Sequence, residues 1–71
     1  EYLKKQLDKN IDVLEITEWQ KSKLKELNIN TIGDLLQSTE SKLMMAYYVG
    51  EVKARQMKNA AMAAVFEYLF G

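Results

Sequence analysis

Twenty consecutive residues near the end of the sequence, 51–70, contain neither glycine nor proline. Apolar side chains recur among them with the i, i+3, i+7 spacing of one helical face, starting at Ala54 and Met57 and ending at Tyr68. This pattern predicts one long helix over about 51–70. After Asn59 the only charged residue is Glu67, so we expect the second half of this helix to be covered on more than one side.

The rest of the composition favours helices as well. The protein has 71 residues, no proline, three glycines and 48% apolar residues, which suits one helical core better than a turn-rich sheet. We predict an all-α fold, a compact domain of four to five helices in which short helices precede the long one. We interpret residues 1–71 as a single domain cut from a larger protein, because the sequence begins with Glu1 and not with methionine.

Capping signals place the short helices along the sequence. Thr17 and Gln20 have the spacing of a capping box, in which a hydroxyl and a side-chain amide satisfy open backbone groups. Thr31 stands in the same relation to Asp34, whose negative charge suits the first turn of a helix. One residue of the pair 38–39, serine or threonine, opens a further helix. The expected short helices cover residues 1–9, 18–27, 32–37 and 40–46.

Several apolar residues outside the long helix are expected in the core. Val13, Leu14 and Ile16 anchor a short irregular segment, and Leu24 and Leu27 face inward from the helix that follows it. Methionine adapts to irregular gaps, so we also interpret all four methionines as core residues: Met44, Met45, Met57 and Met62.

The residue types that are absent limit the chemistry. The sequence has no cysteine and no histidine, which removes thiolate nucleophiles, zinc–sulfur sites and the commonest neutral-pH base. We therefore expect no enzymatic activity, no cofactor and no metal. Ten basic and ten acidic residues give zero net charge, so binding to a polyanion requires a local patch. No apolar run of about 18 residues and no signal-peptide pattern is present, and we expect a cytoplasmic location with no membrane contact.

Three stretches resemble the C-terminal domain of the bacterial RNA polymerase α subunit: IDVLEIT at 11–17, KLKELNINTIGDLLQSTESKL at 23–43 and VGEVKARQMKN at 49–59. The resemblance covers residues 11–56. It leaves outside an extra N-terminal helix at 1–10 and the apolar end of the last helix. It implies a helix-hairpin-helix-like core over 11–71 with a long C-terminal helix. It also implies the functions of that family, which binds the minor groove of A/T-rich DNA and docks activator proteins.

The DNA-contacting positions of that family fall on residues of other kinds. Its minor-groove arginine falls on Trp19, and the asparagine beside it falls on Ser22. Its hairpin asparagine, glycine, lysine and serine fall, in that order, on Tyr48, Gly50, Val52 and Lys53. A tryptophan cannot replace a guanidinium in a narrow, negatively charged groove. The resemblance therefore supports the fold more than this mode of DNA binding.

The hairpin is the first candidate site. Val49, Gly50 and Ala54 fit half of the helix-hairpin-helix pattern, with Gly50 as the tight turn. Backbone amides at the start of the following helix suit a phosphate. We predict contact with the backbone of DNA or RNA, with little sequence specificity, through Gly50, Lys53, Arg55, Lys58, Lys21 and Ser22. Alternatively, Gly50 only permits the turn and the lysines form a solvated face.

Protein interaction is the second candidate function. Trp19 is either a binding anchor or, as we favour, a residue packed in the core or elsewhere within the protein. One of the two tyrosines at 47 and 48 is expected in the core and the other in solvent. A protein–protein interaction or homodimerisation domain on the same fold would use Trp19, Tyr48, Phe66 and Phe70. Its partners would be other domains of the parent protein or a second copy, bound through the C-terminal helix.

Overall fold

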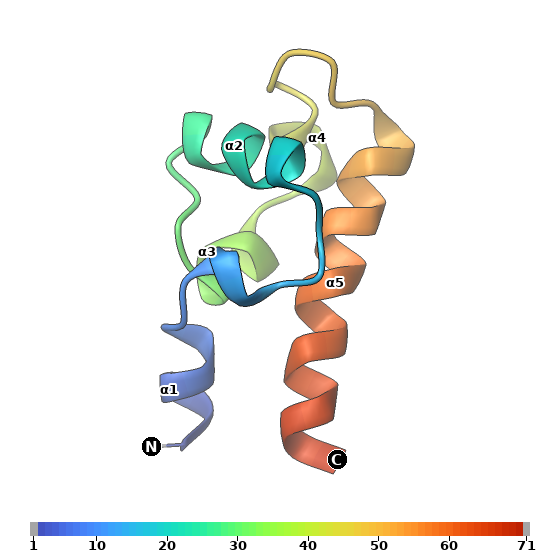
Figure 1. Ribbon diagram of the computed structural model, residues 1–71. Coiled ribbons are helices and arrows are strands. Elements are labelled where there is room, and N and C mark those ends of the chain that lie inside the picture. Colours follow the sequence, from blue (N-terminus) through green and yellow to red (C-terminus); the bar gives the residue numbers. More distant parts are fainter. Residues whose placement is uncertain (1, 71) are drawn as a thin grey trace.

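The computed structural model describes residues 2–70 (Figure 1). Over this range the protein forms five α-helices and one short 3-10 helix, with no strand. In order they are α1 (Tyr2–Leu7), η1 (Ile11–Val13), α2 (Glu18–Glu26), α3 (Ile32–Gln37), α4 (Glu40–Leu43) and α5 (Glu51–Phe70). The predicted all-α fold is confirmed, and the long helix has the predicted bounds. Glu1, the first residue of the expected helix over 1–9, and Gly71 lie outside the described residues.

The long helix α5 forms one wall of the molecule. It runs along most of the height of Figure 1, with α1 beside its carboxyl end and with α2 and α4 beside its amino end. Contacts join α5 to α1, α3 and α4, and the molecule measures 34 × 20 × 20 Å. The loop between α4 and α5 therefore lies at the opposite end from α1.

Threonine caps start three of the short helices. The Thr17 hydroxyl accepts a hydrogen bond from the backbone nitrogen of Gln20 at 3.0 Å. The side-chain oxygen Oε1 of Gln20 accepts one from the backbone nitrogen of Thr17, also at 3.0 Å. Thr31 and Asp34 form the same reciprocal pair at the start of α3. At α4 the cap is Thr39, whose hydroxyl accepts from the Lys42 nitrogen at 3.1 Å. The first residues of these helices can be predicted from the sequence, because each cap depends only on two residues three positions apart.

The helix expected over 40–46 is shorter than predicted and ends at Leu43. Beyond it the backbone turns so that Ala46 and Val49 are buried, at 6% and 5% exposure. In a continuous helix Leu43 and Val49, six positions apart, would point about 120° away from each other. The need to bury Leu43, Ala46 and Val49 on one side therefore ends α4 early and creates the loop that leads to α5.

The buried core draws one or more residues from every segment between η1 and α5. Ile11, Leu24, Leu35 and Leu43 are fully buried in the cluster that covers the inner face of α5. Leu14 is buried as well, whereas Ile16 and Leu27 pack at the edge of the core. The complete set of buried apolar residues is Ile11, Leu14, Leu24, Ile29, Ile32, Leu35, Leu43, Ala46, Val49, Ala54, Met57 and Ala61.

The expectation that Val13 anchors its segment to the core is wrong, because its side chain is 61% exposed. A 3-10 helix has three residues per turn, so residues three positions apart share a face. In η1 that face carries Ile11 and Leu14, both buried. Val13 therefore faces solvent.

Of the four methionines expected in the core, only Met57 is buried, at 1% exposure. Met44 and Met45 are 45% and 77% exposed because they lie in the turn after α4, outside the helix that was expected to carry them inward. Met62 is 39% exposed and follows the buried Ala61 on α5, so it lies at the edge of the inner face.

The tight turn before α5 is made differently from the expectation for Gly50. Gly50 does not have a positive φ, whereas Tyr48 has φ 68°. A left-handed backbone at a bulky residue is strained, because the Cβ atom crowds the following carbonyl group. The strained position of the hairpin is thus Tyr48, two residues before the glycine.

Met57 provides a direct test of this core. Met57→Ala should lower the free energy of unfolding by about 2–5 kcal/mol, because it leaves a cavity beside α5. Met45→Ala is the matched control, since the exposed Met45 should cost no more than about 0.5 kcal/mol. Urea unfolding followed by circular dichroism measures both. Equal losses for the two variants would contradict the packing described.

The cap of α3 predicts a dependence on pH. The Asp34 carboxylate accepts from the backbone nitrogens of Asn30 at 3.3 Å and Thr31 at 3.2 Å, and these bonds lower the pKa of Asp34 below its ordinary 3.8. A carboxyl group whose pKa is lower in the folded state stabilises the fold above its unfolded pKa. That contribution disappears as the pH falls through the folded value.

Asp34→Asn should therefore flatten the fall in melting temperature on acidification, with the two proteins converging at the acid end. Thermal unfolding over a pH series measures this. Glu67→Gln removes an equal charge at the far end of α5 and is the control. A wild-type fall that persists unchanged in Asp34→Asn would show that the cap does not titrate.

Candidate nucleic-acid interface

The loop that joins α4 to α5 forms an open corner at one end of the molecule. Ala46 and Val49 hold the loop to the core, whereas Tyr47 and Tyr48 are 68% and 76% exposed. The expectation that one of the two tyrosines is buried is therefore wrong, because the neighbouring Ala46 and Val49 fill the inward positions. Figure 1 shows this loop at the top of the molecule, arching before it enters α5.

Gly50 lies at the exposed end of this loop, immediately before α5. A Cβ atom built on Gly50 would meet no other atom within 4 Å, so the space in front of its backbone is open. Residues 51–53, the first of α5, are also exposed. The first amide groups of any helix have no partner within the helix and carry its positive end. The corner therefore presents these backbone amides to solvent.

Trp19, on the first turn of α2, lies next to this corner and is 39% exposed. Of the favoured expectation, core or intramolecular packing, the core position is wrong, whereas the ring does pack against side chains of the protein. The inward face of α2 is taken by Gln20 and Leu24, which are four positions apart. The Gln20 side chain donates from Nε2 to Oε1 of Gln56 on α5, at 3.4 Å. This contact joins α2 to α5, and Trp19 lies at the edge of the interface between the two helices.

Two lysines from different helices gather over the Trp19 ring. The Nζ atom of Lys23, on α2, lies 5.5 Å from the ring centroid, and that of Lys53, on α5, lies 5.4 Å from it. Both distances are within the range of a cation–π interaction. Lys23 also pairs with Glu26 at 3.4 Å. The result is a cationic, aromatic surface that spans the amino ends of α2 and α5.

Ser22 belongs to the exposed side of α2 near this surface. Its hydroxyl donates to the Trp19 carbonyl oxygen at 2.7 Å. A serine hydroxyl that donates in this way keeps its lone pairs open to other donors.

The other three basic residues of the expected site have partners within the protein. Lys21 donates to the Asp12 carbonyl oxygen at 2.9 Å, and Lys58 donates to the Ser38 carbonyl oxygen at 2.5 Å. Arg55 pairs with two carboxylates, Glu51 at 2.7 Å and Glu40 at 3.7 Å. The structure thus brings Gly50, Lys53, Ser22 and Trp19 to one end of the molecule, whereas Lys21, Arg55 and Lys58 bind neighbouring segments to one another.

Phe66 and Phe70, the other two expected interaction residues, form a separate surface. They are 56% and 82% exposed, with ring centroids 6.2 Å apart, near the carboxyl end of α5. The second cover expected for this end is not supplied by the described residues, because the short α1 reaches only part of the helix. Phe66 and Phe70 therefore lie at the opposite end of α5 from Trp19 and Tyr48.

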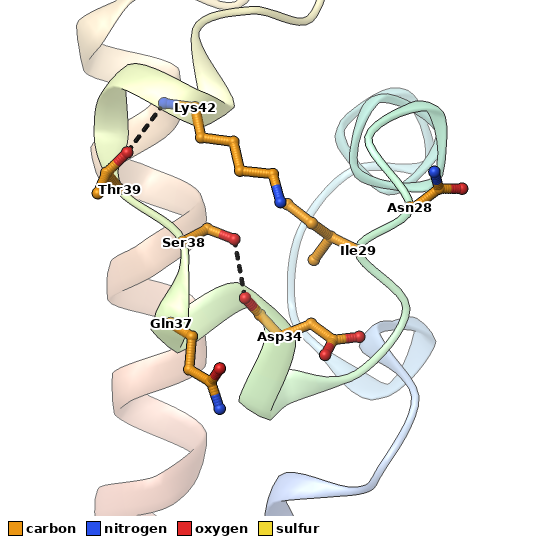
Figure 2. A pocket seen from close by; sticks show the side chains of 7 residues that line it. All are labelled: Asn28, Ile29, Asp34, Gln37, Ser38, Thr39 and Lys42. Atoms are coloured by element: carbon orange, nitrogen blue, oxygen red, sulfur yellow. Dashed lines mark hydrogen bonds between the residues drawn. The ribbon is translucent and has the colours of Figure 1, made fainter.

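A polar pocket lies between α3 and α4 (Figure 2). It is lined by Asn28, Ile29, Asp34, Gln37, Ser38, Thr39 and Lys42. Its polar groups serve the fold: Asp34 and Thr39 cap helices, and the Ser38 hydroxyl donates to the Asp34 carbonyl oxygen at 2.8 Å. Over residues 2–70 no group of three or more His, Cys, Asp or Glu side chains is placed to hold a metal.

Lys23 belongs to the lysines of this helix that the sequence places beside the hairpin, but its contact with Trp19 was not predicted, although a local signal for it exists. It lies four positions after Trp19 on a helix whose start is set by the Thr17 cap, so the two side chains share a face. The contact between Trp19 and Lys53 has no local signal, because it depends on how α2 meets α5.

Residues 1–59 match the family described as the C-terminal domain of the alpha subunit of bacterial RNA polymerase. No curated protein and no solved structure matches significantly. The match includes the N-terminal helix, which the resemblance over 11–56 left outside, and it ends within α5. None of the helices over 2–70 is long and apolar enough to cross a membrane.

The matched residues include every element that forms the open corner, from the cap of α2 to the first turns of α5. This family consists of non-enzymatic domains that bind DNA and other proteins. The match extends over most of the sequence, and the helical structure agrees with it. The protein belongs to the family of C-terminal domains of the bacterial RNA polymerase α subunit.

Proposed function

We propose that the protein is an accessory nucleic-acid-binding module that contacts the sugar–phosphate backbone with little sequence specificity. The observation that carries this proposal is the meeting of Lys23 and Lys53 over Trp19, beside the open corner at Gly50. Membership of a DNA-binding family supports the same interpretation.

The corner offers three kinds of phosphate ligand. The first residues of α5 are exposed and follow Gly50, where a Cβ atom would meet no other atom within 4 Å, and a phosphate at such a helix end is stabilised by the helix dipole. Lys53 lies on the first turn of α5 and supplies a charge. Ser22 adds a hydroxyl from α2, whose proton has to turn from the Trp19 carbonyl oxygen to the phosphate. Hydroxyls, lysines and helix amino ends are the usual contacts of proteins with the nucleic-acid backbone.

The side chains present argue for backbone contact over base reading. Arg55 is the only arginine in the sequence, and its guanidinium is paired with Glu51 and Glu40. The position of the family's minor-groove arginine holds Trp19. Because arginine is the side chain that reads a narrow minor groove, its loss from this position removes the main source of sequence preference.

Lys21, Arg55 and Lys58 take a secondary part in this proposal. Each is held by contacts with a neighbouring segment, so direct phosphate contact would compete with an existing partner. Their charges still act on a polyanion over a distance of about one Debye length, about 8–10 Å at moderate salt. Lys23 is paired as well, with Glu26, and its side chain is only 13% exposed, so it also acts through its charge. We therefore assign the direct contacts to Gly50, Lys53 and Ser22.

Lys53→Gln tests the proposal. Each phosphate contact contributes about −0.9 to the slope of log K against log salt for duplex DNA, so the substitution should make the slope shallower by about that amount. Affinity should fall by a similar factor for every sequence tested. Fluorescence anisotropy with a labelled duplex at several salt concentrations, starting near 50 mM, measures both quantities.

Lys4→Gln on α1 is the matched control, because it removes one lysine from the opposite end of the molecule. It should leave the slope unchanged. Absence of binding to any nucleic acid at the lowest salt, or equal slopes for Lys53→Gln and wild type, would reject the proposed function.

Homodimerisation is the second candidate, and the exposed side of α5 favours it. Arg55, Asn59, Met62, Phe66 and Leu69 are all exposed and follow one another at alternating spacings of four and three. This spacing is that of a coiled-coil seam, and its carboxyl half is apolar. A second copy bound through this seam would cover Phe66 and Phe70. Other domains of the parent protein would fit the same seam.

Phe66→Glu tests this second candidate. If the seam pairs two copies, the wild-type protein should shift from monomer to dimer as its concentration rises in analytical ultracentrifugation, and Phe66→Glu should stay monomeric because it places a charge within the seam. The control is Met45→Glu, an exposed methionine on another surface. A wild-type protein that remains monomeric at millimolar concentration would exclude the homodimer.

A further inference from the structure

Three aromatic side chains stand in solvent around the open corner. Trp19, Tyr47 and Tyr48 are 39%, 68% and 76% exposed. The rings of Tyr47 and Tyr48 lie 4.2 Å apart at an interplanar angle of 89°, so they contact each other edge to face. This surface lies on the same loop and helix ends as Gly50 and Lys53. Exposed aromatic rings are costly in water, and a group of them marks a binding surface.

Tyr48 is held outward at a cost to the fold. Its φ of 68° is a left-handed conformation that glycine adopts without strain. The family's hairpin asparagine falls on this position, so the turn is kept with a bulkier tyrosine on it. Because the side chain is 76% exposed, core packing does not explain its presence. Strained residues of this kind gather at ligand sites.

The cations beside Trp19 indicate the chemistry of the ligand. The Nζ atoms of Lys23 and Lys53 both lie within cation–π range of the ring, at 5.5 and 5.4 Å from its centroid. An apolar protein surface would have to remove water from both ammonium groups. A polyanion that carries flat rings would satisfy the ammonium groups and the aromatic faces together.

Nucleic acid has this combination of groups, but a duplex hides the faces of its bases inside the stack. Only an unpaired strand presents base faces to an aromatic side chain while its phosphates reach nearby cations. Trp19 also occupies the position where the family places the arginine that enters a duplex groove. The aromatic corner is therefore better suited to an open strand than to a closed helix.

We propose that the corner binds single-stranded nucleic acid, with unpaired bases stacked on Tyr48 and on the Trp19 ring, where a base takes the place of the Lys53 ammonium group and that group moves to a phosphate. Lys23 stays paired with Glu26 and adds its charge nearby. This inference rests on the proposed function and names its substrate class. Unpaired bases occur in both DNA and RNA strands, and the binding experiment separates the two sources.

The single tryptophan of the sequence makes the test specific. Because Trp19 is the only tryptophan, its fluorescence reports on this surface alone. The probes are a 15-nucleotide thymidine strand, the matching uridine strand, and a mixed-sequence duplex of equal length. We expect at least one single strand to quench Trp19 and to bind about ten times or more tighter than the duplex, since stacking one base adds about 1–3 kcal/mol.

Three variants test the aromatic contacts. Trp19→Ala should weaken single-strand binding by about 5- to 150-fold, the equivalent of one stacked base, whereas Trp19→Phe should retain most of the affinity. Tyr48→Gly should raise the melting temperature, because it relieves the left-handed strain, and at the same time weaken single-strand binding. A purely structural role for Tyr48 would not give these opposite effects.

Tyr68→Ala is the matched control, because it removes a partly exposed aromatic ring near the carboxyl end of α5, outside the seam, and should leave strand affinity unchanged. The inference is overturned if neither strand quenches Trp19 and binds tighter than the duplex, or if Trp19→Ala and Tyr48→Gly both bind the strand like wild type. In either case duplex binding with a shallower salt slope for Lys53→Gln would leave the proposed function standing. Loss of binding to strands and duplex alike would reject both.

Discussion

The buried face of α5 is the constraint on which the rest of the structure depends. Ala54, Met57 and Ala61 lie along it, fully or almost fully buried. Because the alanine side chain is small, the short helices can approach α5 closely. The flexible side chain of Met57 fills the remaining space. Because α1, α3 and α4 are too short to be stable alone, their geometry comes from packing on this one face.

Packing against α5 also determines the position and the rigidity of the open corner, which is the loop between α4 and α5. Ala46 and Val49 are drawn into the core beside α5, and the two tyrosines between them are left to face outward. The contact between Gln20 and Gln56 fixes α2 against the same helix. Lys23 of α2 and Lys53 of α5 thus lie over Trp19 because the two helices contact each other at this place. Sites built on rigid elements of this kind lose less entropy when a ligand binds.

The parts of the fold that depend on neighbours in the sequence were predictable, and the parts that depend on tertiary packing were not. The caps at Thr17 and Thr31 and the bounds of α5 follow from local spacing. The outward positions of Val13 and Trp19 do not, since other residues on the same turns fill the core positions. For the site, the sequence indicated Gly50 and Lys53, but not that Arg55 pairs with two carboxylates.

The departures from the family pattern fall together at one place. The scaffold of the DNA-binding domain is kept, with its caps, its buried helix face and its hairpin, while the contact positions carry an indole and a phenol in place of a guanidinium and an amide. A guanidinium acts at long range on a groove potential, whereas an aromatic ring acts only on a surface it touches. Such an exchange reduces the attraction to a closed duplex and increases that to an exposed base. Tyr48 has a strained, left-handed backbone, so a tyrosine at this position lowers the stability of the fold. A loop with no ligand to bind would gain nothing in return for that loss of stability.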